Sequence, residues 1–175
     1  MALDLSLTRV GVAGTGADPK EIWVGSIVVR ETAYARLRAI RTEILDHCSG
    51  AELVVVEGPS YGSGTGRRER GHHERAGLWW LVTYGLWARD VPFAVVPPAA
   101  VKRYATGRGQ ATKDAVLLAA ARRYPRVPIE SNDEADALIL LAMGLDHLGR
   151  PLAEVPKSHR AAVASVAWPE AAESA

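Results

Sequence analysis

Four carboxylates stand at positions where a packed core would not accept an unpaired charge. Asp4 lies inside the apolar segment LDLSL, and Glu57 ends the apolar run LVVVE. Asp133 and Asp136 lie in the segment DEADAL, just before a wholly apolar stretch. Their spacing of three residues places Asp133 and Asp136 on one face of a helix. Four carboxylates brought close together repel one another, and a divalent cation is their natural neutraliser.

This all-oxygen ligand set predicts Mg²⁺, with Mn²⁺ as a substitute, rather than Zn²⁺. Two such ions about 3.5–4 Å apart stabilise the attacking and leaving oxygens of an in-line phosphoryl displacement. We therefore expect two ions per site, held by Asp4, Glu57, Asp133 and Asp136. Two alternatives stay open: Glu134 competes with either Asp for a ligand role, and Asp133 at a helix start could serve only the helix dipole.

The elements that must position these side chains have the pattern of an α/β domain. Residues 2–6, 9–15 and 21–30 are predicted to form three strands of an antiparallel meander. The nearly continuous apolar run 51–57 predicts a strand covered on both faces, and 91–98 predicts a fifth strand. Helical patterns occupy the segments 32–48, 72–89, 98–105, 112–124 and 132–148, the last with Asn132 as its N-cap.

This order predicts a five-stranded mixed sheet, three antiparallel strands followed by two parallel ones, flanked by helices. If the first and fourth strands are neighbours, Asp4 and Glu57 lie side by side. The predicted domain spans residues 1–150, and residues 151–175 form an Ala/Pro-rich tail that is partly ordered or disordered.

Composition narrows the class of protein. The chain has 175 residues, of which 48% are hydrophobic and 23% charged, as in one ordinary globular domain. The lone Cys48 excludes a disulfide framework and a cysteine-based zinc finger. The sequence has neither an apolar run long enough for a membrane span nor a signal-peptide pattern. We expect a cytoplasmic protein of a bacterial cell or a phage-infected host.

Charge is distributed unevenly along the chain. Residues 61–126 carry twelve basic and four acidic side chains, a net charge of +8, and residues 127–150 carry a net charge of −4. Of the 21 basic residues, 17 are Arg, whose planar fork suits phosphate oxygens. A basic belt beside an acidic cluster favours a polyanionic substrate next to a metal site. The alternative is an Arg-rich composition with solvated helix faces.

The predicted helix 72–89 is apolar on more than one face. Trp79, Trp80, Tyr84 and Trp87 extend its apolar stripe beyond what one core contact needs. Such a helix is either deeply buried or shared with a partner subunit. We expect these four aromatic residues to form the interface of a homodimer.

Four separated segments, in order, resemble the RuvC family of Holliday-junction resolvases, within the RNase H-like superfamily. LDLSLTRVGVA resembles the first hairpin of the family, and LVVVEGPSYG resembles its fourth strand. PPAAVKRYATGRGQATKDAV resembles the segment with the functional lysines, and NDEADALILLAMG resembles the closing helix. The resemblance covers about residues 2–147, whereas the Gly- and Arg-rich loop after Glu57 departs from it.

The resemblance implies an RNase H-like fold and a homodimeric, Mg²⁺-dependent endonuclease that resolves Holliday junctions by paired nicks. It implies that a metal-activated water attacks the phosphate and leaves a 5′-phosphate and a 3′-hydroxyl. It assigns catalytic roles to the four carboxylates and to Lys102 and Lys113. A branch-migration helicase as a further partner stays unidentified.

Basic and aromatic side chains around these motifs are the expected DNA contacts. They are Tyr61, Arg67, Arg68, Arg70, Arg75, Lys102, Arg103, Arg108 and Lys113. The alternatives are a solvated loop for the arginines, a loop anchor for Tyr61 and surface positions for the lysines. At the level of function, the alternatives are a looser branched-DNA or RNA/DNA-hybrid nuclease, or a non-catalytic nucleic-acid-binding module.

Overall fold

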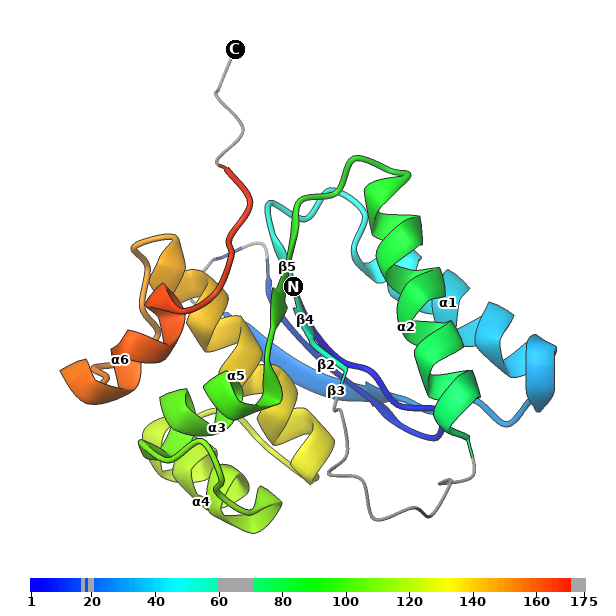
Figure 1. The fold of residues 1–175 in the computed structure, drawn as a ribbon. Helices are drawn as coiled ribbons and strands as arrows, with labels where there is room; N and C mark the ends of the chain where they lie inside the picture. Colours follow the sequence, from blue (N-terminus) through cyan, green and yellow to red (C-terminus); the bar gives the residue numbers. More distant parts are fainter. Residues whose placement is uncertain (17, 19–20, 60–70, 171–175) are drawn as a thin grey trace.

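A five-stranded sheet with helices on both faces organises the chain in a computed structural model, which describes residues 1–16, 18, 21–59 and 71–170 (Figure 1). The strands are β1 (Ala2–Asp4), β2 (Val10–Thr15), β3 (Ile22–Ile27), β4 (Val54–Glu57) and β5 (Phe93–Val96). The helices are α1 (Ala33–His47), α2 (His72–Trp87), α3 (Pro98–Thr106), α4 (Lys113–Arg123), α5 (Asn132–His147) and α6 (Lys157–Ala164).

The strand order is β3-β2-β1-β4-β5, so the shortest strand, β1, lies at the centre of the sheet. β1 pairs antiparallel with β2, which pairs antiparallel with β3. β4 pairs parallel with both β1 and β5. The predicted mixed sheet, three antiparallel strands and then two parallel ones, is therefore confirmed.

The ends of some elements differ from the prediction for local reasons. β1 ends at Asp4 rather than near residue 6, because the Ser6 hydroxyl accepts hydrogen bonds from the N–H groups of Thr8 and Arg9, both at 3.3 Å. Such a side-chain-to-backbone contact replaces the sheet ladder with a turn. The N-cap of α5 is Ser131 rather than Asn132, since the Ser131 hydroxyl accepts from the Glu134 N–H at 3.2 Å.

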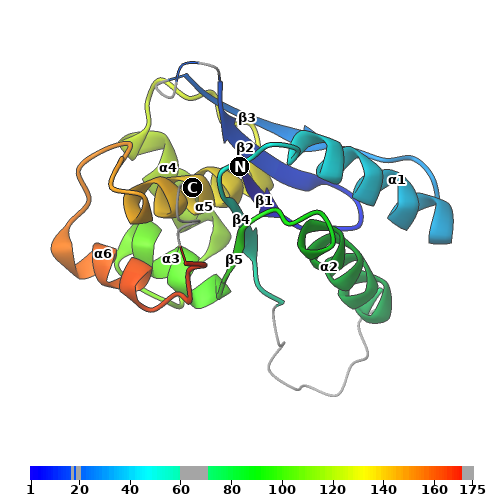
Figure 2. The same ribbon diagram turned by 90° about the horizontal axis from the view of Figure 1, so that it is seen from above.

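The two faces of the sheet are covered by different sets of helices. α1 and α2 lie on one face, and α5 lies on the other with α3, α4 and α6 beyond it (Figure 1, Figure 2). Ala2 and Val55 belong to the core on the α5 face, whereas Leu3 and Val56 belong to the core under α1 and α2. Because side chains alternate along a strand, Asp4 shares the face of Ala2. By the same alternation, the final residue of β4 shares the face of Val55.

The segment that follows α5 returns to the core. α6 packs against α3, and Ala162 is fully buried. Arg160 forms an ion pair and two hydrogen bonds with the buried carboxylate of Asp146, which also accepts from the Tyr104 hydroxyl at 3.2 Å. Residues 157–164 are thus helical and held in place. Within the described part of the chain, no helix has the length and apolar character needed to span a bilayer.

Candidate active site at the carboxyl ends of β1 and β4

Asp4 and Glu57 end two neighbouring parallel strands. The register pairs Ala2 with Val55 and Leu3 with Val56, so the next residues, Asp4 and Glu57, are neighbours on the α5 face of the sheet. Their side chains are joined by a hydrogen bond. Asp4 is 6% exposed. Only its neighbours in this site can compensate the charge of its buried carboxylate.

α5 contributes the other two carboxylates from its first turns. Asp136 is buried, and Asp133 is partly exposed and forms an ion pair with Lys113, with 3.6 Å between Nζ and Oδ1. Asp133 is close enough to Asp4 to raise the pKa of Asp4, and Asp4 is close enough to Asp136 to raise the pKa of Asp136. The structure therefore brings together all four carboxylates that the sequence singled out.

Gly11 allows the start of α5 to reach this edge of the sheet. Gly11 lies opposite Asp4 in the β1–β2 pair. A Cβ atom added at Gly11 would lie 2.0 Å from the main-chain oxygen of Asp133 and 2.5 Å from its carbonyl carbon. The absence of a side chain at this strand position is therefore what brings the helix backbone, and with it Asp133, against the sheet.

Burial and mutual repulsion shift the acid–base equilibria of the cluster. Burial, the charge of Asp4 and the hydrogen bond to Asp4 raise the pKa of Glu57 to about 9. Burial and the charge of Asp4 raise the pKa of Asp136 to about 7. The pKa of Asp4 is also raised, chiefly by burial. The cluster thus retains protons that isolated carboxylic acids would have lost at neutral pH.

Two lysines lie beside the carboxylates. Burial lowers the pKa of Lys113, but Asp4, Asp136, Asp133 and Glu57 outweigh it and the net shift is upward. Lys102, on α3, is near enough to Asp136 to lower the pKa of that carboxyl. Both lysines that the sequence resemblance assigned to the site are therefore near it in space.

The remaining basic and aromatic candidates are more dispersed. Arg103 lies on α3, Arg108 in the turn after it and Arg75 in the first turn of α2, all with exposed side chains. The other four expected DNA contacts lie outside the described residues: Tyr61, Arg67, Arg68 and Arg70.

Glu134 is turned away from the carboxylate cluster. Its Oε1 accepts from the Ser26 hydroxyl of β3 at 2.8 Å, and its Oε2 accepts from the Glu130 N–H at 2.7 Å. Both oxygens therefore attach the start of α5 to β3 and to the preceding loop. These contacts favour a positioning role for Glu134 on the helix that carries Asp133 and Asp136.

Trp79 supports the site, although the sequence analysis placed it in the dimer interface. Its indole Nε1 donates to the main-chain oxygen of Glu57 at 3.0 Å, and its ring packs against the core under α2. It was expected in the dimer interface together with Trp80, Tyr84 and Trp87. Those three are 60–68% exposed, whereas Trp79 is half-buried and points toward β4.

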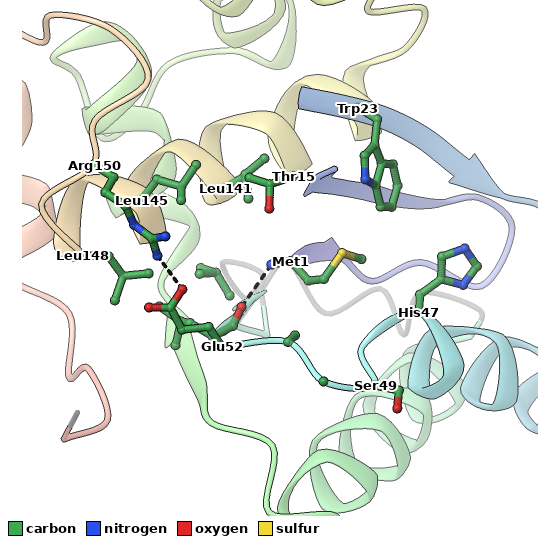
Figure 3. A pocket seen from close by; sticks show the side chains of 15 residues that line it. Met1, Thr15, Trp23, His47, Ser49, Glu52, Leu141, Leu145, Leu148 and Arg150 are labelled. Atoms are coloured by element: carbon green, nitrogen blue, oxygen red, sulfur yellow. Dashed lines mark hydrogen bonds and ion pairs between the residues drawn. The ribbon is translucent and has the colours of Figure 1, made fainter. Parts of the chain in front are cut away.

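A separate hollow of about 450 Å³ lies away from this site (Figure 3). Met1, Trp23 and His47 line it, together with an ion pair between Arg150 and Glu52 at 2.5 Å. It lies at the amino ends of β1 and β4, because Met1 precedes the first of these strands and Glu52 the second. Ligands of open α/β sheets bind at the carboxyl ends of the strands, where the carboxylates lie.

The sheet order and the carboxylates at its centre define an RNase H-like α/β fold. Among solved structures, the chain is similar to Thermus thermophilus RuvC, with a TM-score of 0.58 and 20% identity, over 88% of this chain and 97% of that one. It is also similar to T. thermophilus RuvC in complex with a Holliday junction substrate, with a TM-score of 0.56 and 21% identity, over 88% and 96%. No family model and no curated protein matches the sequence. The chain thus has the fold of RuvC, as its motifs led us to expect.

We expect Gly11→Ala to lower the free energy of unfolding by about 2 kcal/mol or more, because the new methyl group collides with the Asp133 backbone. Gly25→Ala, in the neighbouring strand, is the matched control, since its Cβ would meet only Val12 at 3.9 Å. Urea denaturation of both variants measures the difference. Equal stabilities would show that α5 does not depend on this close approach.

We also expect the free energy of unfolding to fall as the pH rises toward 9. The folded pKa of Glu57 is about 9 and its ordinary value is 4.5, so the folded protein binds more protons than the unfolded chain between these values. Glu57→Gln should flatten this dependence, and Glu43→Gln, an exposed site on α1, should not. Urea midpoints measured with a chelator across this range provide the test. Midpoints that increase with pH would contradict the clustering.

Proposed function

We propose that the chain is a divalent-metal-dependent endonuclease that cuts branched DNA, with the four-way Holliday junction as its main substrate. The observation that carries this proposal is the convergence of four carboxylates from β1, β4 and α5 with Lys113 at one edge of the sheet. A solved structure with the same fold was determined with a Holliday junction substrate, which supports this choice of nucleic acid.

The donor set fits Mg²⁺ or Mn²⁺ by its chemistry, because every donor is a carboxylate oxygen. Asp4, Glu57, Asp133 and Asp136 would hold two ions, and the mutual repulsion that raises the pKa of Glu57 and Asp136 is what cations would relieve. Within the described residues, no three such side chains already surround one point.

Bound Mg²⁺ supplies Lewis-acid stabilisation of the negative charge that develops on the phosphate during hydrolysis. Residues of the chain itself hold a proton and contact the phosphate. Glu57 holds the proton that it shares with Asp4, which limits the charge of the cluster before substrate arrives. Lys113 turns from Asp133 toward the phosphate, and Lys102 adds a second positive charge from α3. The expected products are a 5′-phosphate and a 3′-hydroxyl.

Basic side chains on three helices and one turn flank this edge and would contact the DNA backbone. Lys102 and Arg103 lie on α3, Arg108 in the turn after it, Lys113 at the start of α4 and Arg75 on α2. Phosphate contacts of this kind position a nucleic acid without reading its sequence. A nicking assay on four-way, flap and RNA/DNA-hybrid substrates separates junction resolution from a broader nuclease activity or from binding alone.

We propose further that the enzyme is a homodimer joined through α2. Trp80, Tyr84 and Trp87 follow one another at helical spacing and leave most of their side chains exposed. Aromatic residues in a contiguous exposed stripe are typical of the centre of an interface. A second copy is the fitting partner, because a two-fold dimer can present one site to each of two strands of a junction.

Each of Asp4→Asn, Glu57→Gln, Asp133→Asn and Asp136→Asn should abolish Mg²⁺-dependent cleavage of a four-way junction while leaving junction binding largely intact. The carboxylates hold the metal, whereas the basic side chains hold the DNA. Cleavage is measured on labelled junctions and binding by fluorescence anisotropy. Glu43→Gln is the matched control, because Glu43 is an exposed carboxylate on α1 outside the cluster. Full cleavage by any one of the four variants would remove that residue from the site.

Trp87→Glu or Tyr84→Glu should convert a dimer into a folded monomer, because a charge at the centre of an apolar interface is not compensated. The monomer should bind metal but make single nicks instead of paired cuts. Light scattering and a supercoiled cruciform assay measure the two effects. Val28→Glu, an exposed apolar position next to β3, should leave the dimer intact. A monomeric wild type at micromolar concentration without DNA would contradict the interface.

A further inference from the structure

A groove lined by several basic side chains lies beside α4. It encloses about 940 Å³ between α4, the turn after α3 and the start of α6. Arg108, Arg122, Arg123 and His159 line it, and no acidic residue is found among the described residues of its walls. The groove therefore presents three positive charges and a titratable ring to an anionic ligand.

The floor of the groove is a stripe of small side chains on α4. Thr112, Ala115, Ala119 and Arg122 follow one another at three- and four-residue steps, which places them on one helix face. The alanine side chains are short, whereas Leu118, which is 50% exposed, adds a large apolar side chain to the same lining.

The walls of the groove are fixed by contacts to the core. Thr106 accepts a hydrogen bond from the Arg108 N–H at 3.2 Å and donates to the Lys102 oxygen at 2.8 Å, which holds the turn. Gly107 has a φ of 81° and no side chain, so His159 of α6 can approach it; a Cβ there would lie 2.7 Å from Nε2. The wall formed by α6 is in turn anchored by its ion pair with Asp146.

The arginines have different roles. Arg123 donates to the oxygens of Tyr104 at 3.1 Å and Ala105 at 2.8 Å, so its charge is fixed at the end of α3. The side chains of Arg108 and Arg122 are exposed, and within the described part of the chain neither forms an ion pair. Two positive charges are therefore available to a ligand beside one that is already immobilised.

Consecutive residues of the chain connect the groove with the proposed cleavage site. Thr112 lines the groove, and the next residue, Lys113, contacts the carboxylate cluster. We propose that the groove binds the phosphate backbone of a duplex arm of the branched DNA, away from the phosphate that is cut; this rests on the function proposed above. Thr112 and Arg122 are about 15 Å apart along the helix axis, which matches about four to five base-pair steps.

The test combines protein variants with chemically neutralised DNA. Wild type, the double variant Arg108→Gln/Arg122→Gln and the control Arg38→Gln, an exposed site on α1, are bound to a four-way junction in the presence of Ca²⁺. A second junction carries uncharged methylphosphonates about four to six steps on either side of the cut position. Affinities are measured over a range of salt concentrations.

We expect the double variant to lower the log–log salt slope by about 1.8, or about 0.9 for each lost phosphate contact. We also expect the methylphosphonates to weaken binding by wild type and by Arg38→Gln but not by the double variant, because the two changes remove the same contacts. Arg123 is kept unchanged, since its substitution would release the end of α3.

Three outcomes would overturn the groove proposal. If wild type binds and cuts the junction but the two changes weaken binding additively, the groove does not hold the arm and the proposed function stands. If poly-glutamate binds wild type and not the double variant while junction binding is equal for both, the groove is a site for an acidic protein. If wild type neither binds nor cuts branched DNA, the proposed function fails and the groove proposal fails with it.

Discussion

The close approach of the Asp133 backbone to Gly11, which leaves no room for a Cβ atom, determines where the four carboxylates of this protein meet. It presses the start of α5 onto the centre of the sheet, at the end of a strand that is only three residues long. Asp136, one turn further along the helix, is carried into the same space as Asp4 and Glu57. Ser26 and Glu134 secure this placement from β3, so one buried carboxylate holds the helix that carries two of the clustered ones.

The electrostatic cost of this arrangement is visible in the pKa values of the cluster. A stable fold would not by itself select two buried carboxylates and a half-buried one within reach of one another, since each disfavours ionisation of the next. Lys113 offsets part of the repulsion from a position where it is still 61% exposed. Local instability of this kind is common at functional sites, where the opposing charge arrives with a ligand or a cofactor.

The strands, their parallel or antiparallel sense and the four carboxylates could be predicted from the sequence, because alternation and charge in apolar segments are local signals, whereas the adjacency of β1 and β4 was only a condition of the prediction. The supporting contacts could not. In the sequence, Trp79 is one of several aromatic residues in an apolar helix. Only the fold shows that its indole donates a hydrogen bond to the main-chain oxygen of Glu57. Ser131 and Asn132 are both good N-caps, and only the backbone geometry decides between them. The packing of α6 depends on the ion pair between Asp146 and Arg160. The Ala-rich sequence around Arg160 has no motif that predicts this pair.

The shortness of β1 limits the changes in chain length that the protein can accept. An insertion or deletion of one residue between Ala2 and Asp4 would reverse the alternation and drive the carboxylate into the core under α1 and α2. A change of two residues would restore the face but displace the carboxylate by about 6.6 Å along the strand. The central strand therefore tolerates replacement of its apolar side chains far better than any change in their number, and the same holds for β4 before Glu57.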